Sequence, residues 1–149
     1  MNDRSLILLV EDDQNDVLLI RRGLTAAGIQ NPCHHCPNGE DAIDYLKGEG
    51  RYENRADYPL PALILLDLKL PGKDGFEVLH WIRTHTQFEH IRVVVTTVST
   101  EIRHVNRAYQ LGANSFLTKP LEFENPEALL STLGGEQFSP PQFTTVPIP

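Results

Sequence analysis

Five short runs that are typical of β-strands divide this chain, and the segments between them carry helix signals. The central run, residues 62–67 (ALILLD), is continuous and apolar, which is typical of a strand buried on both faces. The five runs are 5–10, 33–36, 62–67, 92–97 and 115–118. Because strands and helices alternate, the sequence predicts an α/β fold with a doubly wound, five-stranded parallel sheet and helices on both faces.

Five helices are expected, one after each strand. They run from about residue 15 to Gly28, from Asn38 to Gly48, over 76–83, from Ser99 or Thr100 to Gly112, and from Asn125 to Gly134. Asn38 and Ser99 or Thr100 are the expected N-caps of the second and fourth helices. The polar segment 48–62, which carries two prolines, is predicted to be a surface loop.

Length, charge and cysteine content exclude several classes of function. A chain of 149 residues can bury one core, and we expect a domain over 1–135 followed by a proline-rich tail over 136–149. The net charge of −7 argues against non-specific nucleic-acid binding, which requires a basic face. No apolar run approaches the roughly 20 residues of a membrane span. Two cysteines and no recognisable secretory signal predict a cytoplasmic location.

Acidic, hydroxyl and basic side chains follow the predicted strands at one edge of the sheet. Glu11 and Asp12 follow the first strand, and Asp67 and Thr97 end the third and fourth strands. Lys119 follows the fifth strand. Because the carboxyl ends of parallel strands meet at the same edge, these five side chains are expected to converge on one pocket.

The expected pocket is suited to phosphate chemistry assisted by a metal ion. Two unit charges of like sign about 4 Å apart repel by roughly 4 kcal/mol at an effective dielectric constant near 20. Mg²⁺ relieves this repulsion because it prefers oxygen ligands, and it lets an anionic phosphate approach a carboxylate. Asp67 is therefore a candidate phosphoryl acceptor, with Lys119 and the Thr97 hydroxyl holding phosphoryl oxygens.

The motifs that carry these residues resemble the receiver domain of two-component response regulators. They are LLVEDDQND, LILLDLKLPGKDGFEVL, VVVTT and LGANSFLTKP, and the resemblance covers about residues 5–133. Thr97 follows Asp67 by 30 residues and Lys119 follows it by 52, as in that family. The resemblance implies the flavodoxin-like strand order 2-1-3-4-5, and a phosphorylation-dependent switch in place of a turnover enzyme.

The resemblance also implies a role for each acidic residue. Asp67 would accept the phosphoryl group from a phosphohistidine of a partner kinase. Asp12 would bind Mg²⁺ directly and Glu11 would bind it through water. Asp67 and the backbone carbonyl of Lys69 would complete the protein ligands, and Mn²⁺ or Ca²⁺ would substitute for Mg²⁺.

Further residues would read the phosphorylated state in a protein of this family. Thr97 and Lys119 would contact the phosphoryl group, and Phe116 would turn inward as Thr97 moves. Pro71 and Gly75 would shape the turn after the acceptor, where glycine can supply an unusual backbone angle.

One subgroup of the family is similar to this chain in more detail. The insertion at 48–62, the segment AYQLGANSF and the lack of an output domain resemble the small stand-alone regulators that partner cyanobacterial phytochrome histidine kinases. This resemblance implies a phytochrome-type sensor histidine kinase as the partner. It also implies a homodimer through the expected fourth helix, fifth strand and fifth helix, to which the tail at 136–149 could add contacts.

Two residues depart from the family's usual pattern around the switch threonine. Thr96 replaces an apolar residue and Val98 replaces a small one. Since side chains alternate along a strand, Thr96 should point away from Thr97. We expect the branched side chain of Val98 to restrict access of water and kinase, which would slow both phosphorylation and hydrolysis at Asp67.

Two other functions are left open by the sequence. A phosphatase of the haloacid dehalogenase type also uses an aspartate nucleophile, but it needs a second aspartate where this chain has Lys69. The other alternative is a receiver-like interaction module that is never phosphorylated. The intact set of acidic residues, threonine and lysine argues against this module, although Val98 keeps it open.

The stretch PCHHCP (32–37) has the C-x-x-C spacing of zinc and redox sites. We expect it to form the second strand, with Cys33 and His35 on one face and His34 and Cys36 on the other. Ligands divided between two faces cannot surround one zinc ion. The stretch is therefore predicted to be structural.

Overall fold

The sheet of this protein has five parallel strands in the order β2-β1-β3-β4-β5, as predicted. The computed structural model describes residues 5–98 and 101–119. The strands are β1 (Ile7–Val10), β2 (Cys33–Cys36), β3 (Leu63–Asp67), β4 (Arg92–Thr97) and β5 (Ser115–Thr118). The bounds of β2, β4 and β5 match the prediction, whereas β1 and β3 begin two residues and one residue later.

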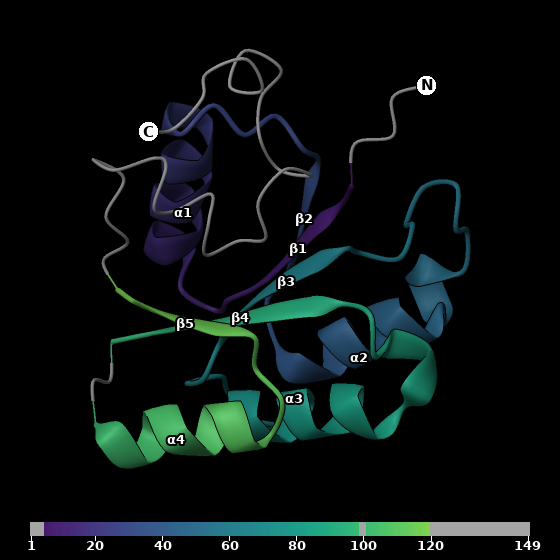
Figure 1. Cartoon of the computed structure of the whole chain (residues 1–149). Coiled ribbons are helices and arrows are strands. Elements are labelled where there is room, and N and C mark those ends of the chain that lie inside the picture. The colour runs from purple at the N-terminus through teal and green to yellow at the C-terminus, as the bar shows by residue number, and fades with distance from the viewer. Residues whose placement is uncertain (1–4, 99–100, 120–149) are drawn as a thin grey trace, which may run out of the picture.

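Helices cover both faces of the sheet, which confirms the doubly wound architecture. Figure 1 shows α1 (Gln14–Ala26) on one face, and α2 (Gly39–Lys47), α3 (Gly75–Thr84) and α4 (Ile102–Gln110) on the other. Alternate strand residues pack against the two layers: Ile7, Leu9, Leu63, Leu65 and Val94 on the α1 side, and Leu8, Val10, Ile64, Leu66 and Val95 on the other. Each of these side chains is fully buried, and burial of one such side chain stabilises the fold by about 1.5–3 kcal/mol. The core therefore fixes the positions of the strand ends.

Side-chain caps fix where three of the helices begin. The Asp13 carboxylate accepts from the backbone amides at the start of α1, and Asn38 accepts from Asp41 N at the start of α2. Asp74 and Glu77 form a reciprocal capping box at the start of α3. The predicted cap at Asn38 is thus confirmed. α4 instead begins after Glu101, which makes no side-chain cap bond.

The segment 48–62 is more than the surface loop that the sequence predicted. It contains a 3₁₀ helix, Gly50–Tyr52, and Tyr52 is only 4% exposed. The guanidinium of Arg55 donates to Tyr45 O at 2.8 Å, to Leu46 O at 2.7 Å and to Tyr58 O at 3.0 Å. Gly48 N already donates to Tyr45 O at 3.1 Å, so the bond from Arg55 is a second one there, whereas at Leu46 it satisfies a carbonyl of the last turn of α2. The surface loop is thus confirmed for most of this segment, but its polar composition did not reveal the anchoring by Arg55 or the burial of Tyr52.

The C-x-x-C stretch forms β2 and divides its side chains as predicted. Cys33 packs on the α1 side, and Cys36 lies in the core on the other side. His34 is on the same side as Cys36, where its Nδ1 lies 2.9 Å from Tyr45 Oη. His35 Nε2 donates to a backbone carbonyl, that of Glu11, at 2.7 Å. Both thiols are free.

Several predictions fall outside the described residues. They concern the caps Ser99 and Thr100, the helix expected from Asn125 to Gly134, the domain end at 135 and the tail at 136–149. Among the helices of residues 5–98 and 101–119, none has the length and apolar character needed to cross a membrane.

Candidate functional site

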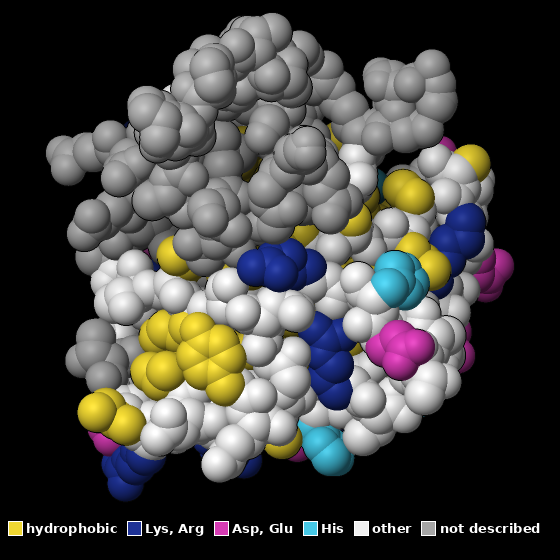
Figure 2. Space-filling view, viewed as in Figure 1, with side chains coloured by type: hydrophobic (Ala, Val, Ile, Leu, Met, Phe, Trp, Pro, Cys, Tyr) yellow, Lys and Arg dark blue, Asp and Glu magenta, His cyan; other side chains and the backbone are white. Residues whose placement is uncertain are grey.

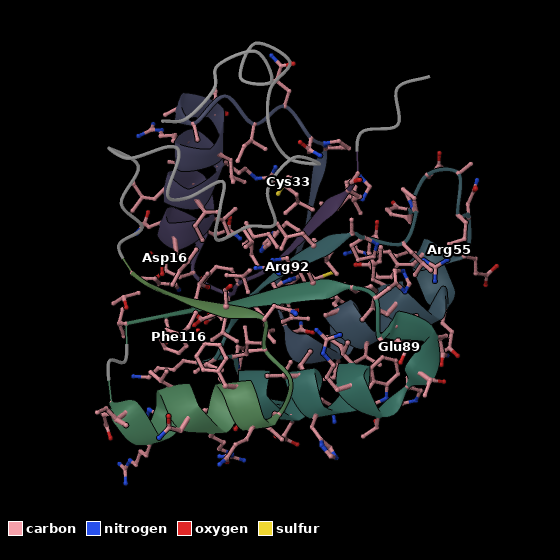
Figure 3. The ribbon with its side chains drawn as sticks, viewed as in Figure 1. Asp16, Cys33, Arg55, Glu89, Arg92 and Phe116 are labelled. Carbon is pink, nitrogen blue, oxygen red and sulfur yellow. The ribbon has the colours of Figure 1, made fainter. Side chains whose placement is uncertain are left out.

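Lys119 lies among three carboxylates at the carboxyl edge of the sheet. Its Nζ lies 2.5 Å from Glu11 Oε1, 3.0 Å from Asp16 Oδ2 and 3.3 Å from Asp67 Oδ2. The backbone amide of Lys119 donates to Thr97 O at 2.8 Å, which ties the end of β5 to β4. Figure 3 shows Asp16 at the N-terminal end of α1, close to β5. The predicted convergence of Glu11, Asp67 and Lys119 is confirmed.

Burial controls the protonation of this cluster. Glu11 has no exposed surface, and burial raises its pKa to about 7 although the hydrogen bond from Lys119 opposes the rise. Burial also raises the pKa of Asp67, again against the charge of Lys119. Burial alone would lower the pKa of Lys119, but its hydrogen bonds and ion pairs with the carboxylates outweigh burial and raise it. Three carboxylates thus share one ammonium, whose single positive charge cannot neutralise all of them.

Two carboxylates of this cluster and the neighbouring Asp12 are arranged for a metal ion. Glu11, Asp12 and Asp67 each offer an oxygen, and these atoms lie within 4.8 Å of one another. Within the described part of the chain, no other group of three His, Cys, Asp or Glu side chains meets this distance. Asp12 is exposed, whereas Glu11 and Asp67 are buried. A hard divalent cation fits this set, because it would have oxygen ligands from the protein and water on the open side.

Gly75 is required for a reason that the sequence did not reveal. Its backbone angle is ordinary, and the positive φ of this turn belongs to Gly72, at 70°. A Cβ atom on Gly75 would collide with the carbonyl oxygen of Asp67 and would lie 2.5 Å from Leu68 Cα. Gly75 N also donates to Leu68 O at 2.9 Å. The expectation of an unusual angle at Gly75 was wrong, because close backbone packing against Asp67 is what excludes a side chain.

The end of β4 presents two threonines to different sides of the sheet. Val94 packs on the α1 side and Val95 on the other, so Thr96 faces α1 and Thr97 points away from it, as predicted. Thr96 is the register partner of Asp67, and its buried hydroxyl has no hydrogen-bond partner among the described residues. Val98, which directly follows Thr97, is 59% exposed.

Two other predicted site residues lie at this edge. Phe116 is half-buried and packs against the core on the α4 side of the sheet, and Figure 3 shows it between β5 and α4. The backbone amide of Lys69 donates to Asp67 Oδ1 at 3.2 Å. The switch role of Phe116 and the metal contact of the Lys69 carbonyl stay predictions.

Asp16 is the site residue that sequence reasoning missed. It lies in the first turn of α1, where its carboxylate is one of three that contact Lys119. The available signal was its place in the chain: Asp16 lies in the first turn of the helix that directly follows the acidic pair at the end of the first strand.

Comparison with known proteins agrees with this geometry. The family model described as the response regulator receiver domain matches residues 7–131. The chain belongs to the response regulator receiver family. Two-component signalling is therefore the setting in which this receiver domain acts.

Curated relatives cover most of this receiver domain. The response regulator Rcp1 of Synechocystis sp. is 41% identical over 118 residues, which are 79% of this chain and 78% of Rcp1. A probable methanogenesis regulatory protein, FilR2 of Methanothrix harundinacea, is 40% identical over 126 residues, covering 83% of this chain and 77% of FilR2.

Solved structures include regulators associated with phytochromes. The bacteriophytochrome response regulator RtBRR is 41% identical with a TM-score of 0.79, over 89% of this chain and 79% of that one. The phosphorylated cyanobacterial phytochrome response regulator RcpA is 32% identical with a TM-score of 0.77, over 88% and 94%. The Mn²⁺-bound form of Rcp1 is 34% identical with a TM-score of 0.75, over 97% and 99%. This receiver domain is thus related to phytochrome response regulators.

Proposed function

We propose that this receiver domain accepts a phosphoryl group on Asp67 from a sensor histidine kinase and signals by changing its protein contacts. The observation that carries the proposal is the position of Lys119 Nζ, 3.3 Å from Asp67 Oδ2 inside a buried acidic cluster. A buried ammonium beside a carboxylate can bind an oxygen of an incoming phosphoryl group. The phosphorylated structure of the relative RcpA supports the same chemistry.

The transfer needs one nucleophile and one leaving group. An oxygen of Asp67 attacks the phosphorus of the kinase's phosphohistidine, so that an O–P bond forms while the N–P bond breaks and its electron pair returns to the imidazole. Lys119 exchanges carboxylate partners for a phosphoryl oxygen. Thr97 contacts a second phosphoryl oxygen, and Phe116 turns inward in response. The receiver domain is itself phosphorylated, and it returns to its starting state only when the phosphoryl group is hydrolysed. It is therefore not a turnover enzyme.

Mg²⁺ is the cation that we assign to the acidic cluster. Glu11, Asp12, Asp67 and the backbone carbonyl of Lys69 would hold it, with Mn²⁺ or Ca²⁺ as substitutes. When bound, the cation would neutralise charge between Asp67 and the phosphoryl group. The carboxylate oxygens within 4.8 Å of one another and the Mn²⁺-bound structure of the relative Rcp1 support this assignment.

Intact mass measurement after incubation with Mg²⁺ and acetyl phosphate tests the proposal. We expect the wild-type chain to gain the mass of one phosphoryl group, and chelation of the metal or the substitution Asp67→Asn to abolish the gain. Asp57→Asn, in the exposed loop, is the matched control. An unmodified wild-type chain, or a gain that persists in Asp67→Asn, would refute phosphorylation at Asp67.

A phytochrome-type histidine kinase in the cytoplasm is the partner that we propose. The support is the names of the relatives, which include bacteriophytochrome and cyanobacterial phytochrome regulators. Phosphotransfer profiling against purified kinases would test it. Faster transfer from phytochrome-type kinases is expected, and equal or slower transfer than from unrelated kinases would count against it.

A homodimer through α4, β5 and residues 125–134, to which the tail could add contacts, is also proposed. Ile102 and Tyr109 of α4 are 75% and 47% exposed. Figure 2 shows hydrophobic side chains gathered over the α4 and β5 end of the molecule. Light scattering with and without phosphorylation would test the proposal, and Ile102→Asp should give monomers. A wild-type chain that is monomeric in both states would contradict it.

The exposed Val98 favours one second candidate function. If its side chain blocked access to Asp67 completely, the domain would act as an interaction module that is never phosphorylated. The mass measurement above separates the two functions. A haloacid dehalogenase-type phosphatase gains no support, because Lys69 occupies the position of the required second aspartate.

A further inference from the structure

A cavity of about 390 Å³ lies over the outer edge of β2. Its walls come from α1, β2, α2 and the segment 48–62, and its polar lining includes Arg21, His34, His35, Arg51, Tyr52 and Tyr58. Figure 3 shows Cys33, at the α1 wall of the cavity, beside α1. Since β2 is an edge strand, no neighbouring strand of the described sheet closes this side of the cavity.

The cavity is cationic in a chain of net charge −7. Arg21 and Arg51 lie on its α1 and 3₁₀-helix walls, and no carboxylate of the described residues lines it. Arg21 Nη1 donates to Cys33 O at 3.1 Å. Arg51 Nη2 donates to Tyr52 Oη at 2.6 Å, and its nearest acidic partner, Asp41, lies 3.6 Å away outside the lining. Each guanidinium has five N–H donors, so both retain donors for an anion.

The hydrogen-bond network also presents an acceptor to the ligand. Tyr45 Oη donates to Pro59 O at 3.0 Å, so it must accept from the Nδ1–H of His34 at 2.9 Å. Burial and the charge of Arg21 both lower the pKa of His34, which favours the neutral ring. A neutral ring protonated on Nδ1 leaves Nε2 as an acceptor.

The tyrosines of the cavity wall pack against one another. Tyr58 meets Tyr45 and Tyr52 edge to face, with interplanar angles of 86° and 89°. The segment that carries Tyr58 is anchored through Arg55. A preformed cavity of this size, with aromatic walls and a few fixed polar groups, is typical of small-molecule sites.

We propose that this cavity binds a small phosphate monoester attached to a planar base, the chemistry of a mononucleotide. Guanidinium groups bind phosphate oxygens in a two-pronged geometry, which suits Arg21 and Arg51. A base that carries an amino group can donate to His34 Nε2 and lie against the tyrosine wall. This inference does not depend on phosphorylation of Asp67.

Isothermal titration of the full chain with adenosine monophosphate, inorganic phosphate and adenosine tests the proposal. The Asp67→Asn variant in metal-free buffer is used so that phosphate cannot bind the acidic cluster through a metal. We expect the monophosphate to bind more tightly than either inorganic phosphate or adenosine. Arg21→Met and Arg51→Met should each weaken binding by about tenfold or more.

Matched controls keep the result interpretable. Arg22→Met removes an exposed arginine of α1 that does not line the cavity, so it should leave binding unchanged. Circular dichroism would verify folding, and the imidazole NMR signals of His34 should shift on binding. Absence of monophosphate binding at millimolar concentration would overturn the proposal. Binding that survives both cavity substitutions, or that Arg22→Met abolishes equally, would also overturn it.

Discussion

The ammonium of Lys119 lies closer to Glu11, at 2.5 Å, than to Asp67, at 3.3 Å. Lys119 is therefore held mainly by a residue other than the proposed acceptor, and Asp16 adds a second contact at 3.0 Å. Under the proposed function, phosphorylation of Asp67 would redistribute these contacts. The energetic weight of Lys119 in the metal-free domain can be measured directly.

Lys119→Met should destabilise the metal-free domain by about 3 kcal/mol, because it leaves buried carboxylates without their cation. Mg²⁺ should then stabilise this variant more than the wild type, since it would take over that neutralisation. Urea unfolding with and without Mg²⁺ measures both effects. Lys47→Met, at an exposed position, should change neither. A Lys119→Met variant as stable as the wild type without metal would contradict the inferred role.

Gly75→Ala should destabilise the fold by about 3 kcal/mol and slow phosphorylation, because the new methyl group would collide with the backbone of Asp67 and Leu68. Gly50→Ala is an informative comparison. Gly50 has open space around it but a φ of 62°, so alanine there should cost about 1–2 kcal/mol without affecting phosphorylation. Equal effects of the two substitutions on phosphorylation would argue against close packing at Asp67 as the cause.

Thr96→Val should stabilise the domain by about 1–2 kcal/mol, because it replaces a buried hydroxyl without a hydrogen-bond partner by a methyl group of similar size. Thermal and urea unfolding of the variant provide the test. A loss of stability would instead show that the hydroxyl has a partner in solution, such as a buried water.

Val98→Ala should accelerate both phosphorylation by acetyl phosphate and hydrolysis of the phosphorylated form, because it removes branched bulk next to Thr97. Stability should hardly change, since Val98 is 59% exposed. Leu60→Ala serves as the control, because Leu60 is also an exposed apolar residue but lies on the segment 48–62. Unchanged rates of phosphorylation and hydrolysis in Val98→Ala would contradict the hypothesis that Val98 restricts access to Asp67.

Alkaline pH should destabilise the domain through Cys36. Burial raises the pKa of this thiol to about 12 from an ordinary 9.0, so the folded chain retains a proton that the unfolded chain loses. The contribution of the protonated thiol to the free energy of unfolding is complete below pH 9 and is lost progressively as pH rises toward 12. At pH 10 the loss is about 1.4 kcal/mol. Cys36→Ala should flatten the dependence of the unfolding free energy on pH between 8 and 10. An unchanged slope would contradict the assignment to this thiol.

The parts of the fold that the sequence predicted well are those encoded by short-range patterns. The bounds of β4 and β5 followed from apolar runs, and the cap at Asn38 followed from a local side-chain bond. Tyr52 was missed because its burial depends on packing against Cys36, Tyr45 and Tyr58, which no local apolar pattern records. The anchoring of segment 48–62 by Arg55 was missed for the same reason.

The site could be predicted only as far as strand ends determine it. Glu11, Asp67 and Lys119 converge because parallel strands deliver them to one edge. Asp16 comes from a helix, and its contact with Lys119 depends on how α1 packs on the sheet. The requirement for glycine at position 75 depends on a backbone approach that no local pattern records.

The three bonds from Arg55 to the end of α2 and to Tyr58 have a consequence for engineering this domain. A variable-looking insertion is normally the first choice for a peptide tag, a fluorescent-protein graft or new chain termini. Here such a change would remove the bonds from Arg55 to the carbonyls of Tyr45 and Leu46 and would expose Tyr52. The junction that looks most tolerant of modification in the sequence is one that a designer should leave intact.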